Sequence, residues 1–193
     1  MNGVIRRVGA GVLFMFLAVN GRAVAESIQY RVLATSKTST MEKEMNAAAE
    51  AGYRFTTVMG GETSFGGSEV VVVMQRTDAA GRPRYGYKLL ATSKTSTMQQ
   101  ELQRASDDGY EYVGQTVFET AFGGHEVVCL LERDKDASRG TKYEYKLVAT
   151  KRTSTLEKEV ESSGAAGYQV LGMTVGETLL GGKELIAITR RAK

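Results

Sequence analysis

Paired glutamates recur three times in this chain, and each pair flanks two consecutive glycines. The segments read ETSFGGSE, ETAFGGHE and ETLLGGKE, and their glutamates are Glu62, Glu69, Glu119, Glu126, Glu177 and Glu184. Carboxylate oxygens suit Ca²⁺, and two carboxyls about 5–10 Å apart can hydrolyse a glycosidic bond. Calcium loops, however, are dense in Asp and Asn, and these segments are not. We therefore expect solvated strand ends and keep the glutamates as a candidate binding set only.

An apolar residue stands beside each pair of glycines and is the second candidate for binding. These residues are Phe65, Phe122 and Leu180. At the tip of a hairpin, such a side chain either packs on a neighbouring part of the protein or is offered to a partner. Aromatic residues of the preceding segments could in addition form a sugar-stacking face: Tyr53, Phe55, Tyr110, Tyr112 and Tyr168. Their position on one strand face predicts instead that they belong to the core.

The chain has one histidine, His125, and one cysteine, Cys129. The other two segments have Ser68 and Lys183 at the position of His125, so a catalytic or metal-binding role for this histidine is not favoured. Cys129 lies in the apolar run VVCLL, which predicts a buried thiol rather than a reactive one. One His and one Cys in the same strand cannot build a His-rich zinc site. We predict no catalytic residue, no metal site and no cofactor.

Residues 1–25 have the features of a secretory signal peptide. Two arginines precede an apolar run at 8–19, and Ala23 and Ala25 supply the small residues that a signal peptidase requires. A membrane anchor is the competing interpretation, but a spanning helix needs about 20 apolar residues and this run is shorter. We predict cleavage after Ala25 and a secreted or periplasmic protein with no stable membrane insertion after cleavage.

The net charge argues against nucleic acid as a partner. The chain has 25 Lys and Arg against 22 Asp and Glu, and residues 1–25 contain three of the arginines and no acid. The segment after the predicted signal peptide therefore carries 22 charges of each sign. A protein that follows a phosphate backbone is expected to keep a basic excess or stripe.

Three copies of one unit account for most of the remaining chain. Residues 30–76, 87–133 and 145–191 align without a gap, and an octapeptide ATSKTSTM occurs in the first two copies and as ATKRTSTL in the third. Residues 77–86 and 134–144 are polar and read as linkers. Repeats of this kind indicate one supersecondary unit per copy.

Each copy reads as strand, helix, strand, hairpin and strand. The opening segments YRVLAT, YKLLAT and YKLVAT alternate apolar and polar residues, a helical stripe follows, and the closing segments such as VVVVM are apolar throughout. The prediction is an α+β protein of three tandem β-α-β-β repeats, each a three-stranded sheet with one helix on one face. Because apolar closing strands require cover on both faces, the second face should pack on a neighbouring repeat or on another molecule, and we expect the repeats to form one compact body. The strand order 1-3-2 is favoured within each repeat.

The repeated octapeptide is interpreted as a strand end followed by a helix cap, not as a catalytic loop. A serine followed three residues later by Glu or Gln forms a capping box, and the serines in question are Ser39, Ser96 and Ser154. A glycine at the end of each helical stripe is typical of a left-handed C-cap. These glycines are Gly52, Gly109 and Gly167.

The third copy carries a resemblance to a known family. It opens with YEYKLV, continues with a helix that contains Leu156 and Glu159, and then has Gly167-Tyr168 and the closing run LIAITRR. This pattern resembles a small bacterial family of domains of unknown function, whose units of about fifty residues read Tyr-Glu-Tyr-Lys, a Leu/Glu helix, Gly-Trp-Glu and a basic last strand. Here a tyrosine takes the place of the family's tryptophan. The resemblance implies the β-α-β-β fold and no catalytic residue.

The function expected from these observations is an exported, non-enzymatic binding or assembly module for an unknown protein or cell-envelope partner. Its contacts are expected on the face formed by the three hairpins. Two alternatives stay open: a hydrolase that uses the hairpin glutamates, and a purely structural envelope protein.

Overall fold

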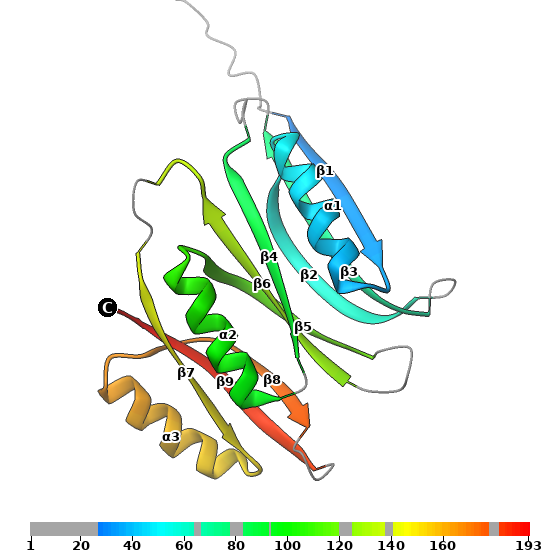
Figure 1. The fold of residues 1–193 in the computed structure, drawn as a ribbon. Coiled ribbons are helices and arrows are strands. Elements are labelled where there is room, and N and C mark those ends of the chain that lie inside the picture. Colours follow the sequence, from blue (N-terminus) through cyan, green and yellow to red (C-terminus); the bar gives the residue numbers. More distant parts are fainter. Residues whose placement is uncertain are drawn as a thin grey trace, which may run out of the picture.

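The computed structural model describes residues 27–63, 67–77, 83–92, 94–119, 125–137, 141–177 and 182–193. The predicted signal peptide lies outside these residues. The described chain forms three β-α-β-β units, as the repeats predicted, and they pack side by side into one body (Figure 1). We call them unit 1, unit 2 and unit 3 in chain order.

The three units have the same elements in the same order. Unit 1 consists of β1 (Ile28–Thr35), α1 (Thr38–Glu50), β2 (Arg54–Thr63) and β3 (Gly67–Thr77). Unit 2 consists of β4 (Tyr85–Thr92), α2 (Thr95–Asp107), β5 (Glu111–Glu119) and β6 (His125–Asp134). Unit 3 consists of β7 (Tyr143–Thr150), α3 (Thr153–Ala165), β8 (Gln169–Glu177) and β9 (Lys183–Ala192).

The last strand of each unit lies in the middle of its sheet. The strand orders are β1-β3-β2, β4-β6-β5 and β7-β9-β8, which confirms the predicted order 1-3-2, and all paired strands are antiparallel. The second strand carries a bulge at the same place in every unit, after Phe55, Tyr112 and Val170. The repetition of this bulge shows that the units share backbone detail and not only topology.

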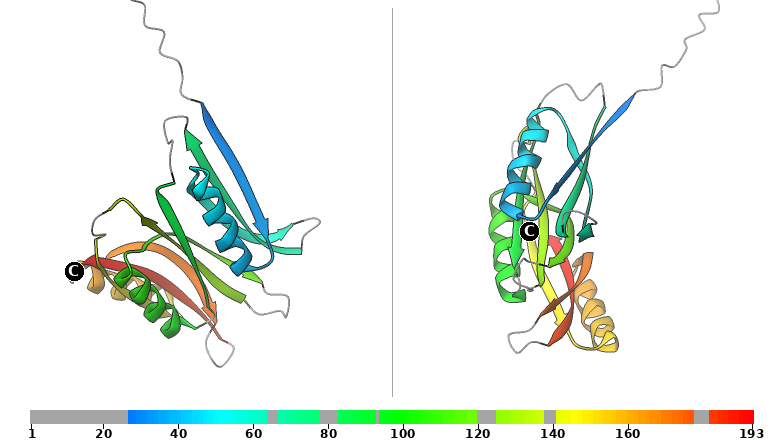
Figure 2. Two further views of the ribbon diagram at one scale, coloured as in Figure 1. Left: turned by 45° about the horizontal axis from the view of Figure 1, so that its top comes forward. Right: turned by 90° about the vertical axis from the view of Figure 1, so that its right-hand side faces the viewer.

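The helices α1 and α2 bury the apolar stripes that their sequences predicted. Met41, Met45 and Ala48 of α1 are fully buried against their own sheet, and Met98 and Leu102 do the same in α2. The helix α3 buries less, because only Leu156 and Ser163 are buried along it. In the right-hand view of Figure 2, α1 and α2 lie on one side of the molecule, whereas α3 lies at its far end on the other side. Unit 3 therefore has the smallest core.

The middle strands of units 2 and 3 are covered on both faces, as their continuous apolar character predicted. In β6, Cys129 and Leu131 face the core of α2, whereas Val128 and Leu130 belong to the core that contains α1. Unit 1 therefore covers the second face of the sheet of unit 2. In β9, Ile188 likewise joins the core of unit 2.

The glycines that follow the helices have the conformation that the sequence predicted. Gly52, Gly109 and Gly167 all have φ of 84°, in the left-handed region. The amide of Tyr53 donates to the carbonyl of Ala48 at 3.0 Å, and the amide of Gly52 donates to that of Ala49 at 2.9 Å. These two bonds close the end of α1 as a Schellman motif.

The predicted serine caps were wrong. The N-cap residues are Lys37, Lys94 and Arg152, none of which makes a side-chain cap hydrogen bond, so Ser39, Ser96 and Ser154 lie inside the first turn. A threonine two residues before the N-cap bonds the backbone here instead, because the amide of Lys37 donates to Oγ1 of Thr35 at 3.2 Å. The carboxylate of Glu42 does not close a capping box either, since it bonds a strand of the next unit.

The predicted linkers were too long. The strand β4 begins at Tyr85 and β7 begins at Tyr143, inside the segments read as linkers, and β6 extends to Asp134. The two tyrosines are held because Arg54 stacks on the ring of Tyr85 at 4.3 Å and Arg190 stacks on that of Tyr143 at 3.9 Å. The first contact joins units 1 and 2 and the second lies within unit 3, so contacts with the folded units order residues that look like linker in the sequence.

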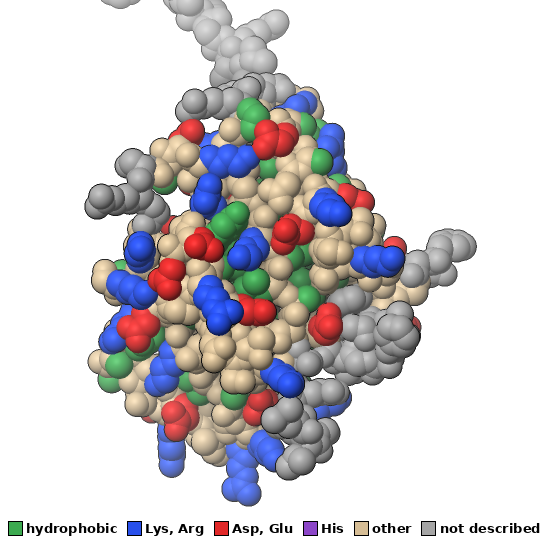
Figure 3. Space-filling model, viewed as in Figure 1, with side chains coloured by type: hydrophobic (Ala, Val, Ile, Leu, Met, Phe, Trp, Pro, Cys, Tyr) green, Lys and Arg blue, Asp and Glu red, His purple; other side chains and the backbone are tan. Residues whose placement is uncertain are grey.

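Lys, Arg, Asp and Glu side chains are interspersed over the face shown in Figure 3, with no stripe of one sign. None of the helices in the described part of the chain is long and apolar enough to cross a membrane.

Candidate functional site

The predicted hairpin face is only partly described. Phe65, Phe122 and Leu180 lie outside the described residues, and so do the side chains of Glu119 and Glu177. The proposal that the hairpin tips bind a partner therefore stays a prediction.

The first glutamate pair does not form a catalytic pair of carboxyls. Glu62 pairs with Ser68 across the β2–β3 hairpin, and Glu69 pairs with Gly61. Because neighbouring positions on a strand point to opposite faces, Glu62 and Glu69 lie on opposite faces of the sheet. In unit 3, Glu184 accepts a hydrogen bond from Oγ1 of Thr95 in unit 2 at 2.8 Å. The described residues hold no group of three His, Cys, Asp or Glu side chains that could bind a metal ion.

The described polar side chains that bond another unit lie where one unit meets the next. At junction 1–2, between units 1 and 2, the helix α1 lies along the free edge of β4. The amide of Leu89 donates to Oε2 of Glu42 at 2.8 Å. The side chain of Asn46 accepts from the amide of Tyr87 at 3.0 Å and donates to its carbonyl at 2.9 Å. Side chains of the helix thus satisfy backbone groups that an edge strand leaves unpaired.

Junction 2–3, between units 2 and 3, repeats this arrangement one unit later. The amide of Leu147 in β7 donates to Oε1 of Gln99 in α2 at 3.0 Å. Gln103 accepts from the amide of Tyr145 at 3.1 Å and donates to the carbonyl of Tyr143 at 3.0 Å. Gln99 and Gln103 occupy in unit 2 the positions that Glu42 and Asn46 occupy in unit 1.

A buried tyrosine and an ion pair fix junction 1–2 on the side of the sheets. The hydroxyl of Tyr87 accepts from the amide of Phe55 at 2.8 Å and donates to Oε2 of Glu132 at 2.8 Å. Glu132 also binds Arg54 through Nε and Nη2, with the shortest distance at 2.8 Å. Burial raises the pKa of the Tyr87 hydroxyl, and the hydrogen bond with Glu132 raises the pKa of Arg54. At neutral pH the phenol is therefore neutral and the guanidinium charged.

Junction 2–3 uses the same positions with the charges exchanged. Glu111 of β5 stands where unit 1 has Arg54, and Arg190 of β9 stands where unit 2 has Glu132. Their closest atoms are 3.6 Å apart. The hydroxyl of Tyr145 accepts from the amide of Tyr112 at 3.1 Å, and burial raises its pKa. The position of the pair is thus repeated, whereas its polarity is not.

Glycines let the second strands of neighbouring units approach each other. A Cβ atom added to Gly114 would lie 3.1 Å from Cζ of Phe55. One added to Gly172 would lie 2.5 Å from the Oη of Tyr112. Because Gly114 and Gly172 occupy the same position in units 2 and 3, each junction seats an aromatic side chain of one unit over a glycine of the next.

Three of the tyrosines that could have stacked on a sugar stand one residue before β2, β5 and β8 and have cations over their rings. Arg31 and Arg76 lie over the ring of Tyr53 at 4.5 and 4.9 Å. The same contacts recur in the other units, where Lys88 and Arg133 lie over Tyr110, and Lys146 and Arg191 lie over Tyr168. These rings thus take part in interactions that stabilise each unit.

The exposed apolar side chains mark two sides of the molecule. Of the seven large apolar residues that are exposed among the described ones, three lie on β1 and three on β8: Ile28, Tyr30, Val32, Val170, Met173 and Val175. The contrast is sharpest for Tyr30, which is 60% exposed, whereas the equivalent Tyr87 and Tyr145 are 2% and 3% exposed. The side of the repeat that is buried in units 2 and 3 is therefore exposed in unit 1.

Two hollows adjoin unit 3. One of about 470 Å³ is lined by β5 and β8 and includes Met173, Val175 and Lys183. The other, of about 530 Å³, lies beside the start of α3. The thiol of Cys129 lines neither, because it is fully buried, as predicted, and burial raises its pKa to about 12. The first hollow adjoins the exposed apolar residues of β8.

Comparison with family models, with curated proteins and with solved structures found no match for this chain. The resemblance to the family of domains of unknown function therefore stays a prediction.

Sequence reasoning missed the junction residues. Glu42, Asn46, Gln99 and Gln103 read as ordinary solvated helix positions. A signal was present in Arg54 and Glu111, because equivalent positions of a repeat carry opposite charges there. Opposite charges at equivalent positions indicate that the residue bonded to each of them also changes its charge from one repeat to the next.

Proposed function

We propose that this protein is an exported, non-enzymatic assembly module that binds a protein partner through the uncovered side of unit 1. The observation that carries this proposal is the exposure of Tyr30, in contrast to the burial of Tyr87 and Tyr145 at the same position. A row of exposed apolar residues on an edge strand is a site where another protein chain can add. Figure 1 places β1 at the outer edge of the molecule.

The free edge of β1 adds backbone groups to this surface. At the edges of β4 and β7, the helix of the preceding unit supplies hydrogen-bonding side chains. Within the described residues, β1 packs against its own α1 and β3 and has no second helix along its free edge. The partner is therefore expected to bring donors and acceptors as well as apolar side chains.

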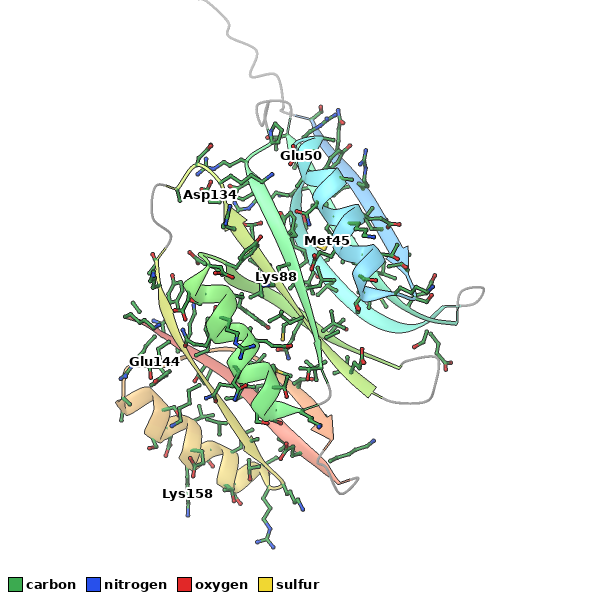
Figure 4. All side chains as sticks on the ribbon, in the orientation of Figure 1. Met45, Glu50, Lys88, Asp134, Glu144 and Lys158 are labelled. Carbon is green, nitrogen blue, oxygen red and sulfur yellow. The ribbon has the colours of Figure 1, made fainter. Side chains whose placement is uncertain are left out.

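Site-specific photocrosslinking in cells that export the full chain tests this proposal. A photoreactive residue at position 32 is expected to form adducts with a protein. The matched control is position 158, because Lys158 projects from α3 into solvent and its equivalents Lys43 and Gln100 are also exposed (Figure 4). Equal labelling at the two positions, or none at either, would contradict the proposal.

Export and processing are tested separately. The mass of the protein recovered from outside the cytoplasm should correspond to a chain that begins at Glu26. A chain that keeps residues 1–25 after fractionation with membranes would favour the anchor interpretation instead.

The hydrolase alternative receives no support from the described glutamates, because the carboxyls of Glu62 and Glu69 lie on opposite faces of their sheet.

A further inference from the structure

We propose that the partner is a second copy of this chain, whose unit 3 docks on unit 1 and continues the internal repeat from one molecule to the next. This inference rests on the proposed function and names its partner. The head surface is the uncovered side of unit 1 and consists of Tyr30, Val32, Thr57, Val71, Val73 and Gln75. The tail surface is the uncovered side of unit 3 and consists of Glu157, Glu161, Gln169, Val170 and Met173.

The two surfaces hold the positions that the internal junctions use. Each junction takes the helix and the second and third strands from one unit, and the first, second and third strands from the next. Unit 3 has a free helix and second strand, and unit 1 has the strands. A molecule built in this way can bind another head to tail through one more junction of the same kind.

The positions that carry an ion pair at each internal junction hold two compatible residues at the proposed contact. Junction 1–2 pairs Arg54 with Glu132, and junction 2–3 pairs Glu111 with Arg190. At the corresponding positions of a tail-to-head contact stand Gln169 and Gln75. Two neutral amides can bond each other, whereas a charge left on only one side would be buried without a partner. Both the head and the tail surface thus carry a neutral residue where the internal junctions carry opposite charges.

The residue beneath each charged pair also differs between the internal junctions and the proposed contact. Tyr85 and Tyr143 lie under the guanidinium groups of Arg54 and Arg190. The neutral contact would have Ile28 at that position, which suits a place with no cation above it.

The packing positions match as well. Phe55 lies over Gly114, and Tyr112 lies over Gly172. In a tail-to-head contact the upper residue is Val170 and the lower one is Thr57. A smaller side chain above is thus accompanied by a larger one below, which keeps the volume at the contact similar.

The outer face of the first sheet needs the cover that a second copy would bring. Val128 and Leu130 belong to the core of unit 1, Ile188 belongs to the core of unit 2, and Ile186 is also buried. The equivalent residues of unit 1, Val71 and Val73, are only half-buried. They present the same apolar row on a sheet face that no preceding unit covers in the described structure.

Two departures from the pattern make this contact weaker than the internal junctions. Asn46 and Gln103 both donate and accept, but Glu161 at the equivalent position is a carboxylate and can only accept from the amide of Tyr30. Lys135 pairs with Glu50, and Lys193 pairs with Asp107, whereas unit 3 has Ala165 at that position. The contact is therefore expected to be reversible.

Two blocking variants, studied by sedimentation velocity on protein produced from the full chain, test the inference. Val32→Arg blocks the head surface and Val170→Arg blocks the tail surface; both positions are exposed, so the fold should survive, and thermal unfolding checks this. The unmodified protein should associate at concentrations up to about 100 μM, as for a micromolar Kd. Each variant alone should stay monomeric.

The decisive sample is an equimolar mixture of the two variants. Each pair of molecules then has one intact tail and one intact head, so the mixture should form a dimer and nothing larger. Pairing of two β1 edges would give a different result, because Val170→Arg alone would still dimerise and the mixture would gain nothing. Lys158→Glu is the control and should associate like the unmodified protein.

An unmodified protein that stays monomeric would overturn the inference. If position 32 still crosslinks to a protein of another mass, the proposed function holds and only the identity of the partner is wrong. If position 32 forms no adduct and the protein is monomeric, both fail.

A designed pair sharpens the test. Gln169→Glu together with Gln75→Arg copies the pair Glu111 and Arg190 onto the contact. The double variant should associate two- to five-fold more tightly than either single variant at low salt, the range of an exposed ion pair. An unchanged affinity in the double variant would mean that the two positions do not meet.

Discussion

Junctions 1–2 and 2–3 bury the same positions of the repeat but divide the charges in opposite ways. At junction 1–2 the acid is the buried partner, since the side chain of Glu132 is 8% exposed and that of Arg54 is 56% exposed. At junction 2–3 the base is the more buried one, and its distance to the acid is longer. The repeat thus fixes where the units touch, while the side-chain pairs differ from one contact to the next.

The largest expected difference in stability is between variants of the two junction glutamates, Glu132 and Glu111. Glu132→Ala removes the partner of Arg54 and of the Tyr87 hydroxyl, and should lower the free energy of unfolding by about 2–3 kcal/mol, somewhat less than for a fully buried pair. Glu111→Ala, at the looser pair, should cost about 1 kcal/mol or less. Urea unfolding of both variants measures the difference. Equal losses would show that burial of the acid does not decide the strength of a junction.

A second comparison concerns the close approach of the second strands. Gly172→Ala brings a methyl group against the Tyr112 hydroxyl and should destabilise the protein by about 1–3 kcal/mol. Gly114→Ala, with the longer contact to Phe55, should cost less. Gly164→Ala in α3 is the control: a Cβ there meets no atom within 4 Å, so it should stabilise the helix by up to about 1 kcal/mol. A harmless Gly172→Ala would mean that the strands can move apart freely.

The three equivalent tyrosines test the role of the hydroxyl. Tyr87→Phe removes two hydrogen bonds and should cost about 1–2 kcal/mol, and Tyr145→Phe, which removes one from the amide of Tyr112, should cost about 1 kcal/mol. Tyr30→Phe should leave the stability of the dilute monomer unchanged. Thermal unfolding at low protein concentration checks this order. A loss from Tyr30→Phe in the monomer would argue against an uncovered head surface.

The smallest expected effect is on the stability of the protein at low pH. Lys193 lowers the pKa of Asp107 through a hydrogen bond and ion pair at 2.8 Å. A lowered folded pKa contributes stability above the unfolded value near 3.9, and this contribution is lost as the pH falls through the folded value. Asp107→Asn and Lys193→Gln should both reduce the fall in stability below about pH 4. An unchanged pH profile in both would mean that this exposed pair contributes nothing at junction 2–3.

Local patterns predicted the elements of this fold well. The strand alternation, the stripe of Met41 and Met45 and the glycine after each helix are set by contacts within a few residues, so the sequence of one unit is sufficient to identify them. The serine caps failed for the opposite reason. Glu42 belongs to a capping-box pattern in the sequence, but its carboxylate bonds Leu89 of another unit, and no local rule weighs that competition.

The candidate site shows the same division. The hairpin glutamates and tips attracted notice because they repeat, yet repetition alone could not distinguish a binding site from a shared backbone requirement. The contrast between Tyr30 and Tyr87 could not be read from the sequence, because both stand in the same local pattern, YR or YK followed by alternating apolar residues.

By itself, the sequence determined that the chain is built from three β-α-β-β units, in which order the elements follow and which apolar stripes α1 and α2 bury. Only the tertiary structure decided that α1 lies along β4, that Arg54 meets Glu132 and that apolar side chains of β1 and β8 remain exposed. The physical reason is that secondary structure follows from hydrogen bonds and packing over short separations. The junctions depend on which surfaces of nearly identical units meet, and this requires the position of every unit in space.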